Sequence, residues 1–229
     1  MQTEYLTFIA DFKVQDRFAY LSHQETLSFW QRVVVRAQLP LVFTQGFNPR
    51  PRLSLPLPRS VGVQSDCERL CVLVAAEGFS AAAARNAIEP LLPEGCTLIS
   101  TDTAVGKIAF HPASVTYQFT LALPPDETRQ AHLQYCILQT QAGDPICLSR
   151  HMEKGRQRPV DIRPFLEALS CQGQSLRAVC LVRQEGTVRV DELMRWLAVG
   201  PQDLAESVRR TEVQWVFKTT NLQGASYSL

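Results

Sequence analysis

The chain has 229 residues and a net charge of +1, and 45% of its residues are apolar against 20% charged. This composition excludes an intrinsically disordered chain and a collagen-like repeat, and the length fits one large or two small domains. The longest apolar runs, such as residues 70–76, fall far short of the roughly 20 residues that a membrane-spanning helix needs. Because no basic stretch followed by a hydrophobic run opens the chain, we expect a soluble cytoplasmic protein without a membrane partner.

The first half of the chain predicts the element order β-α-β-β-α-β. Apolar residues alternate with largely polar ones from Leu6 to Val14, which indicates a strand with one buried face. Ser22 is followed three residues later by Glu25, a capping box that starts a helix, and Pro40 ends that helix. The predicted elements of this half cover residues 5–14, 23–38, 41–44, 68–75, 80–88 and 96–101.

The second half repeats this order after residues 102–112, which show no clear period. Its predicted elements cover residues 115–123, 126–139, 146–148, 176–183, 191–199 and 211–218. The repeated order predicts an α+β fold of two tandem ferredoxin-like domains with antiparallel sheets, one at residues 1–104 and one at residues 112–229. In such a domain both helices cover one face of the sheet, and RNA-binding proteins often use the other face.

The sequence lacks the common motifs for catalysis and metal binding. It has no Gly-x-Ser-x-Gly, no phosphate-binding P-loop, no dinucleotide-binding glycine motif and no His-Glu-x-x-His. The seven cysteines are an odd number without zinc spacing, and the closest pair, Cys67 and Cys71, is not followed by the third cysteine that an iron–sulfur motif requires. We therefore expect reduced thiols, no metal and no cofactor, and the sequence favours a non-enzymatic role.

Among the four histidines, His23 is the candidate for a general base. It begins the first predicted helix beside Ser22, where the helix dipole favours a neutral imidazole and free backbone N–H groups can hold an anion. The alternative is a residue at the start of a helix that helps to orient Ser22.

Two basic segments are the main candidates for ligand contacts. Residues 45–59 carry three arginines and no acidic residue among several prolines, and residues 150–164 carry five basic residues against two acidic ones. Each is expected to follow the second strand of its domain, so the two are predicted to converge on one phosphate-bearing ligand. The alternative for each is a solvated connection. Because arginine forks suit phosphate and aromatic rings suit base stacking, the predicted phosphate or nucleic-acid contacts are Arg32, Arg36, Phe47, Asn48, Arg50, Arg52, Arg156, Arg158 and Arg163.

Several segments together resemble one known family. They are residues 20–23, 36–40, 44–52, 60–65 with Glu68, and 160–164, and the block Gly-Phe-Asn-Pro at residues 46–49 is the most specific. On these segments the chain resembles the radical-SAM-associated domain of unknown function, as a standalone member without the radical SAM domain. The chain departs from the usual pattern at Arg50, where members of that family carry His. The resemblance implies a bacterial accessory protein that works beside a radical SAM enzyme, with RNA or the ribosome as the substrate.

The leading hypothesis is an adaptor that holds RNA or a ribosomal substrate through its arginine-rich loops for a radical SAM partner. One alternative is a metal-independent RNA-cleaving or RNA-modifying enzyme that uses His23 as general base. Another is a protein-docking module for the radical SAM enzyme without RNA contact. A salt-dependent affinity for RNA favours the adaptor, whereas RNA cleavage that His23→Ala abolishes favours the enzyme.

Overall fold

The computed structural model describes residues 4–151, 155–220 and 226–228, and it divides into two compact units. The first unit comprises Met1–Pro112 and Trp215–Leu229, and the second comprises Ala113–Gln214. The sequence prediction differs at the end of the chain, because it places everything from residue 112 onward in the second domain. Two long strands, β5 (Lys107–Thr120) and β10 (Arg209–Thr220), are each divided between the units. The start of β5 and the end of β10 belong to the first unit, so the last segment of the chain returns to that unit.

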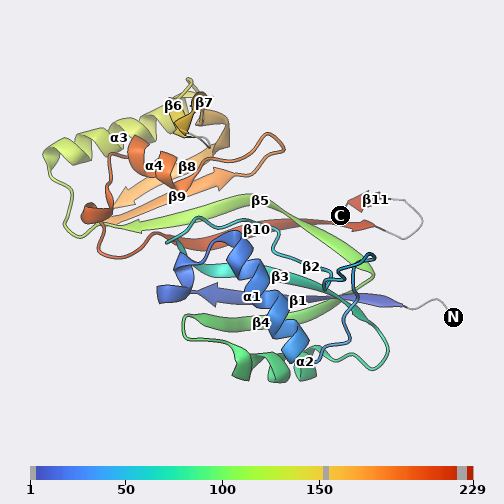
Figure 1. The fold of residues 1–229 in the computed structure, drawn as a ribbon. Coiled ribbons are helices and arrows are strands. Elements are labelled where there is room, and N and C mark those ends of the chain that lie inside the picture. The colour runs from blue at the N-terminus through green and yellow to red at the C-terminus, as the bar shows by residue number, and fades with distance from the viewer. Residues whose placement is uncertain (1–3, 152–154, 221–225, 229) are drawn as a thin grey trace. The chain divides into compact units, whose positions relative to one another are not determined.

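The other elements lie within one unit each (Figure 1). Those of the first unit are β1 (Tyr5–Val14), η1 (Asp16–Tyr20), α1 (His23–Arg36), β2 (Leu53–Ser54), β3 (Gln64–Ala75), α2 (Ala81–Ile88), η2 (Glu89–Leu91), β4 (Cys96–Val105) and β11 (Ser226–Ser228). Those of the second unit are α3 (Glu127–Ala142), β6 (Cys147–His151), β7 (Gln157–Asp161), η4 (Arg163–Phe165), β8 (Leu166–Gln172), β9 (Ser175–Leu181), α4 (Val190–Trp196) and η5 (Pro201–Asp203). The chain is therefore a mixed α+β protein, in which β3 pairs antiparallel with β1 and β2, β4 with β1, β9 with β5 and β8, and β6 with β7.

The first unit packs its helices against one face of its sheet. The strands follow the order β4-β1-β3-β10, and β2 also pairs with β3. Phe12 on β1 meets Trp30 on α1 edge to face, with 4.8 Å between the ring centres, and α2 adds Ala84 and Ile88 to the same core. The predicted capping box at the start of α1 is confirmed, because the Ser22 hydroxyl accepts the Glu25 N–H and the Glu25 carboxylate accepts the Ser22 N–H.

The opposite face of this sheet, which we call the open face, carries a different set of side chains. Successive residues of a strand point to opposite faces, so Thr7, Ile9 and Asp11 of β1 lie on the open face. The register places Leu73, Cys71 and Arg69 of β3 beside them on one side, and Ala104, Asp102 and Ser100 of β4 on the other. The open face is therefore much more polar than the helix-covered face.

The second unit has the strand order β10-β5-β9-β8, with β5 antiparallel to β9 and β9 antiparallel to β8. The inward residues of β5 include Tyr117 and Phe119, and Leu133 of α3 and Leu193 of α4 are buried as well. Strands β6 and β7 form a separate two-stranded sheet. Figure 1 shows α3 and α4 together beside β8 and β9.

The second strand of each half differs from the prediction. In the first half, residues 41–44 make only isolated bridges, and the strand at this place is the two-residue β2. In the second half, the predicted strand at 146–148 lies in β6, whereas β8 takes the place beside β9. The sequence missed β8 because a register shift between Leu166 and Ala168 breaks its alternation. The structure thus places the basic segment at residues 150–164 before β8, whereas the segment at residues 45–59 contains β2.

Candidate anion-binding cleft

Residues 41–54 form a hairpin-like loop at the edge of the first unit. The Val42 N–H donates to Leu73 O, and the Leu73 N–H donates to Arg52 O, so both arms of the loop are tied to β3. Across the loop, the Thr44 N–H donates to Arg50 O at 2.9 Å and the Arg50 N–H donates to the Thr44 hydroxyl at 3.0 Å. The tip is exposed, and Phe47 is fully so. The backbone is thereby fixed while the side chains at the tip face solvent.

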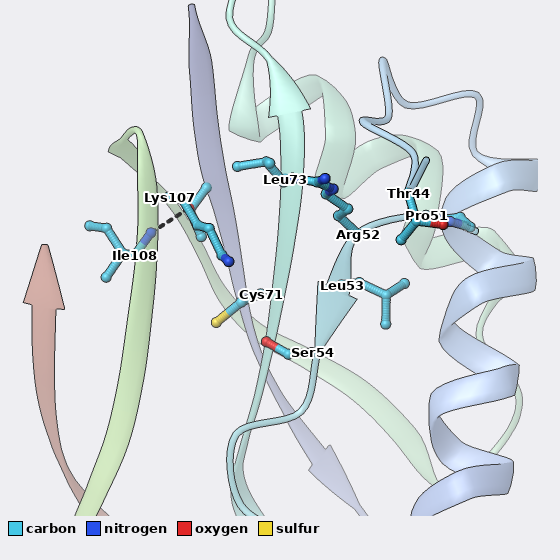
Figure 2. Close-up of a pocket in the computed structure, with 10 residues that line it drawn as sticks. Thr44, Pro51, Arg52, Leu53, Ser54, Cys71, Leu73, Lys107 and Ile108 are labelled. Atoms are coloured by element: carbon cyan, nitrogen blue, oxygen red, sulfur yellow. Dashed lines mark hydrogen bonds between the residues drawn. The ribbon is translucent and has the colours of Figure 1, made fainter. Parts of the chain in front are cut away.

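A cleft of about 500 Å³ lies between this loop and the start of β5. Arg52 and Lys107 both line it, together with Thr7, Thr44 and Ser54. Figure 2 shows Arg52 beside β2 and Lys107 on β5, with the open-face residue Cys71 between them. No carboxylate is among the described residues of this lining, so its charge is positive. We call it the anion cleft.

The start of β5 is fixed on the open face by one threonine. The Thr7 hydroxyl donates to Gly106 O at 2.7 Å and accepts the Ile108 N–H at 3.1 Å. The turn before Lys107 requires a positive φ, which Gly106 supplies at +75°. Lys107 therefore stands on a short, anchored turn at the border of the cleft.

Sequence reasoning missed Lys107, because that residue lies in the segment taken as a domain boundary. The signal that could have found it is a lysine directly after a glycine in a chain whose basic residues are mostly arginine. Its proximity to Arg52 depends on tertiary structure, which local patterns do not report.

The structure separates the arginines of the first basic segment into two kinds. Arg59 is buried, and its guanidinium donates to the carbonyl oxygens of Ala19 at 2.6 Å, Val63 at 2.7 Å and Leu21 at 3.2 Å. It therefore holds the loop onto η1 and is unavailable to a ligand. The guanidinium groups of Arg50 and Arg52, in contrast, make no ion pair with any residue that the structure describes, and both side chains are exposed.

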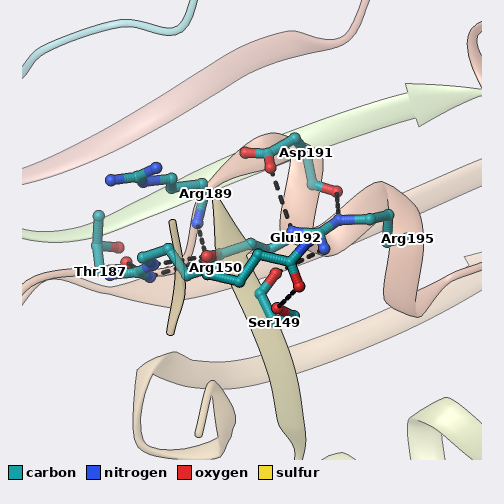
Figure 3. Close-up of polar contacts among 8 residues, drawn as sticks. Ser149, Arg150, Thr187, Arg189, Asp191, Glu192 and Arg195 are labelled. Atoms are coloured by element: carbon teal, nitrogen blue, oxygen red, sulfur yellow. Dashed lines mark hydrogen bonds and ion pairs between the residues drawn. The ribbon is translucent and has the colours of Figure 1, made fainter. Parts of the chain in front are cut away.

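The second basic segment also contains a structural arginine. Arg150 of β6 donates to both carboxylate oxygens of Glu192 at 2.6 and 2.8 Å, and to Thr187 O at 3.0 Å (Figure 3). Burial favours the neutral form of Glu192, but the hydrogen bonds from Arg150 and from the Arg189 N–H outweigh it and lower the pKa of this carboxyl below its usual range. The same hydrogen bond to Glu192 raises the pKa of Arg150.

A second contact joins the β6–β7 hairpin to α4. Arg195 donates to Ser149 O at 2.7 Å, beside the Arg150 pair (Figure 3). The hairpin is thus held by two arginines, one of which is paired with a fully buried carboxylate.

The remaining predicted residues of this segment differ in their availability. The Arg163 guanidinium donates to Leu166 O at 2.9 Å, which makes it part of the η4 turn. Arg156 and Arg158 are exposed. Residues 152–154 of the segment lie outside the described residues.

Helix α1 carries three further residues predicted for the site, His23, Arg32 and Arg36. Arg32 and Arg36 are exposed and His23 is half-buried at the first position of the helix. Because α1 packs on the helix-covered face of the sheet, the structure does not bring this helix together with the anion cleft on the open face.

The buried thiols are poor nucleophiles. Burial raises the pKa of Cys71, Cys96 and Cys180 to about 12, and that of Cys136 to about 11. Cys136 lies 3.5 Å from the His132 ring, but both groups are engaged by Trp196 O.

Within the described ranges, no group of three or more His, Cys, Asp or Glu side chains is placed to hold a metal ion. In the same ranges no helix is long and apolar enough to cross a membrane.

Residues 8–190 match the model of a bacterial family described as "Uncharacterized protein conserved in bacteria (DUF2344)". The chain belongs to this family. The match covers most of the chain and includes the anion-cleft loop, the β6–β7 hairpin and α1, and its description assigns the DUF2344 family no activity.

No curated protein matches the chain. Among solved structures, one match is a chain of the "Crystal Structure of a Cbf5-Nop10-Gar1 Complex", with 13% identity and a TM-score of 0.43. The match covers 90% of the present chain. The present chain spans about half of the length of the matched chain, 48%.

Proposed function

We propose that the first unit binds single-stranded RNA, with a phosphate in the anion cleft and the loop at residues 44–52 along the backbone. The main support is that Arg52 and Lys107 line one cleft whose described lining holds no carboxylate. Two cations with the neighbouring Thr44 and Ser54 hydroxyl groups match the oxygen atoms and the charge of a phosphodiester. An anionic ligand therefore fits this cleft better than a neutral or cationic one.

The exposed tip of the loop supports RNA over a small anion. Phe47 offers a free ring for base stacking, and Asn48 and Arg50 flank it. Pro49, Pro51 and the Thr44–Arg50 hydrogen bonds hold the backbone, so little ordering entropy is lost when a strand binds. A stacking ring beside a positive groove is the usual arrangement of proteins that bind single strands.

Each unit is proposed to be a ferredoxin-like domain. Numbered within its own unit, the strand order is fourth, first, third, second in both: β4-β1-β3 with β2, and β10-β5-β9-β8. In both units the basic segment begins after the first helix, and it ends before β8 in the second unit and spans β2 in the first. This equivalence supports a duplicated plan.

The family resemblance in the sequence supports the wider setting. It points to a cytoplasmic accessory protein for a radical SAM enzyme, which would act on the RNA that this chain holds. The protein-docking alternative would leave Arg52 and Lys107 without a role in RNA binding, so RNA binding by variants separates the two.

Fluorescence anisotropy with a labelled single-stranded RNA of 12 nucleotides, at 50 to 200 mM salt, tests the proposal. Each phosphate contact contributes about 0.7 to the slope of log affinity against log salt, so Arg52→Ala and Lys107→Ala should each reduce the slope by about that amount. Arg36→Ala, an equal charge change on the exposed surface of α1, is the matched control and should leave the slope unchanged. Equal slopes in all four proteins would refute the cleft as the RNA site. Intact RNA after incubation excludes the nuclease alternative.

A further inference from the structure

A second cleft of about 450 Å³ adjoins the anion cleft on the open face of the first unit. Ile108 lines both, and the second cleft is also lined by Arg69, Asp102, Phe110 and Phe217. It therefore combines aromatic rings with a carboxylate, unlike the anion cleft. Two adjoining clefts of different chemistry suit a ligand that carries a phosphate at one end and a ring at the other.

The aromatic wall of the second cleft is held in place by Arg69. Its guanidinium lies 4.7 Å from the centre of the Phe110 ring and 5.1 Å from that of Trp215, and it donates to both carboxylate oxygens of Asp11 at 2.8 and 2.9 Å. Phe110 in turn contacts Phe217, with 5.9 Å between ring centres. Phe217 is still 38% exposed. The wall is thus fixed before a ligand arrives, and one ring keeps a free surface for stacking.

Asp102 supplies the acceptor on the β4 side of this cleft. One of its oxygens accepts the Thr103 N–H at 2.7 Å, which orients the carboxylate, and its side chain is exposed. The other carboxylate of the lining, Asp11, is already engaged by Arg69. Asp102 therefore retains hydrogen-bonding capacity toward a donor in the cleft.

We propose that the second cleft binds a nucleobase that carries an exocyclic amino group, such as cytosine. The base stacks on Phe217, and its amino group donates to the Asp102 carboxylate, which is the usual pairing of an acidic side chain with cytosine. Uracil presents a carbonyl oxygen at the same position, which would face the lone pairs of the carboxylate. The inference rests on the proposed function, because the phosphate of the same strand occupies the anion cleft.

Competition between two homopolymers, 12-nucleotide cytidine and uridine RNAs, tests this inference. The two differ only in the base, so phosphate contacts cancel in the ratio of their affinities. We expect the native protein to prefer the cytidine RNA by about tenfold. Asp102→Asn should reduce this ratio to near one, because the amide can also donate to uracil. Phe217→Leu should lower the affinity of the protein for both RNAs, because the stacking ring is lost. Glu77→Gln, an exposed carboxylate replaced outside the cleft, is the matched control and should keep the preference.

The outcomes separate the two proposals. If both RNAs bind with a normal salt slope but with equal affinity, or if Asp102→Asn keeps the preference, the base cleft is refuted and the anion cleft stands. If neither RNA binds, both proposals are refuted. Melting temperatures of the variants within about 2 °C of the native protein show that the ratios report binding rather than unfolding.

Discussion

Replacement of Arg150 by Ala should destabilise the protein strongly, although it removes a residue from a segment that composition marks as basic and solvated. The change leaves the Glu192 carboxylate, whose side chain is fully buried, without the guanidinium that contacts both of its oxygens. Loss of one partner of a buried ion pair costs about 3 to 5 kcal/mol. For a chain of this length, that cost lowers the melting temperature by roughly 6 to 20 °C.

Differential scanning calorimetry at pH 7 measures the effect, and Arg158→Ala is the matched control. Arg158 faces Arg150 across the β6–β7 pairing and is exposed, so its loss should change the melting temperature by less than about 2 °C. The double variant Arg150→Met with Glu192→Met should recover much of the lost stability, because it leaves no buried charge without a partner. If Arg150→Ala and Arg158→Ala have the same melting temperature, the Arg150–Glu192 ion pair does not have the stabilising role assigned to it.

The pH dependence of this effect has a definite sign. The folded-state pKa of Glu192 is lowered, so its contribution is present above the unfolded pKa, near 4.5, and is lost as pH falls through the folded pKa. In Arg150→Ala the burial of Glu192 remains while the guanidinium is gone, so its carboxyl takes up a proton more readily. The stability difference between native protein and variant should therefore shrink as pH falls from 7 toward 4, as measured by urea unfolding.

Three further changes test other parts of the structure. Arg59→Ala should lower the free energy of unfolding by about 2 to 4 kcal/mol in urea titrations, because buried carbonyl groups lose their charged donor; an unchanged midpoint would contradict this role. Gly95→Ala should destabilise by at least about 1 kcal/mol, because Gly95 has a φ of +82° and the new Cβ would lie 2.5 Å from the Gln15 carbonyl oxygen; a melting curve like that of the native protein would refute this. Iodoacetamide at pH 8 should modify the exposed Cys147 but not Cys180, because burial raises the pKa of Cys180 to about 12 and keeps it a thiol; peptide mass spectrometry that finds equal modification would show that Cys180 is accessible.

Local features of the fold were predictable from the sequence, whereas features that depend on distant partners were not. The alternation of β1 and the Ser22–Glu25 capping box are complete within a few residues, and both are present in the structure. Strand β8 escaped prediction because its bulge disturbs the period of two. The second strand of the second half was therefore misplaced, and in the first half the predicted strand at 41–44 is replaced by the two-residue β2.

The candidate site was likewise predictable in its local features but not in its contacts between distant segments. Composition treats all arginines of a loop alike, but Arg59 and Arg150 bind groups far away in the sequence and are part of the structure, while Arg52 remains exposed. Lys107 lines the same cleft as Arg52 at the start of β5, where the Thr7 hydroxyl holds the turn at Gly106. Such a contact between distant segments requires the fold itself.

The return of Trp215 and Phe217 to the first unit has a consequence for biosynthesis. Strands β1, β3 and β4 all precede the second unit in the chain, but the rings that pack on Phe110 come from β10, which follows it. A nascent chain that has not yet reached β10 therefore holds Arg69 and Phe110 without their contacts to Trp215. Synthesis of β10, rather than folding of the segments that precede the second unit, therefore completes this surface.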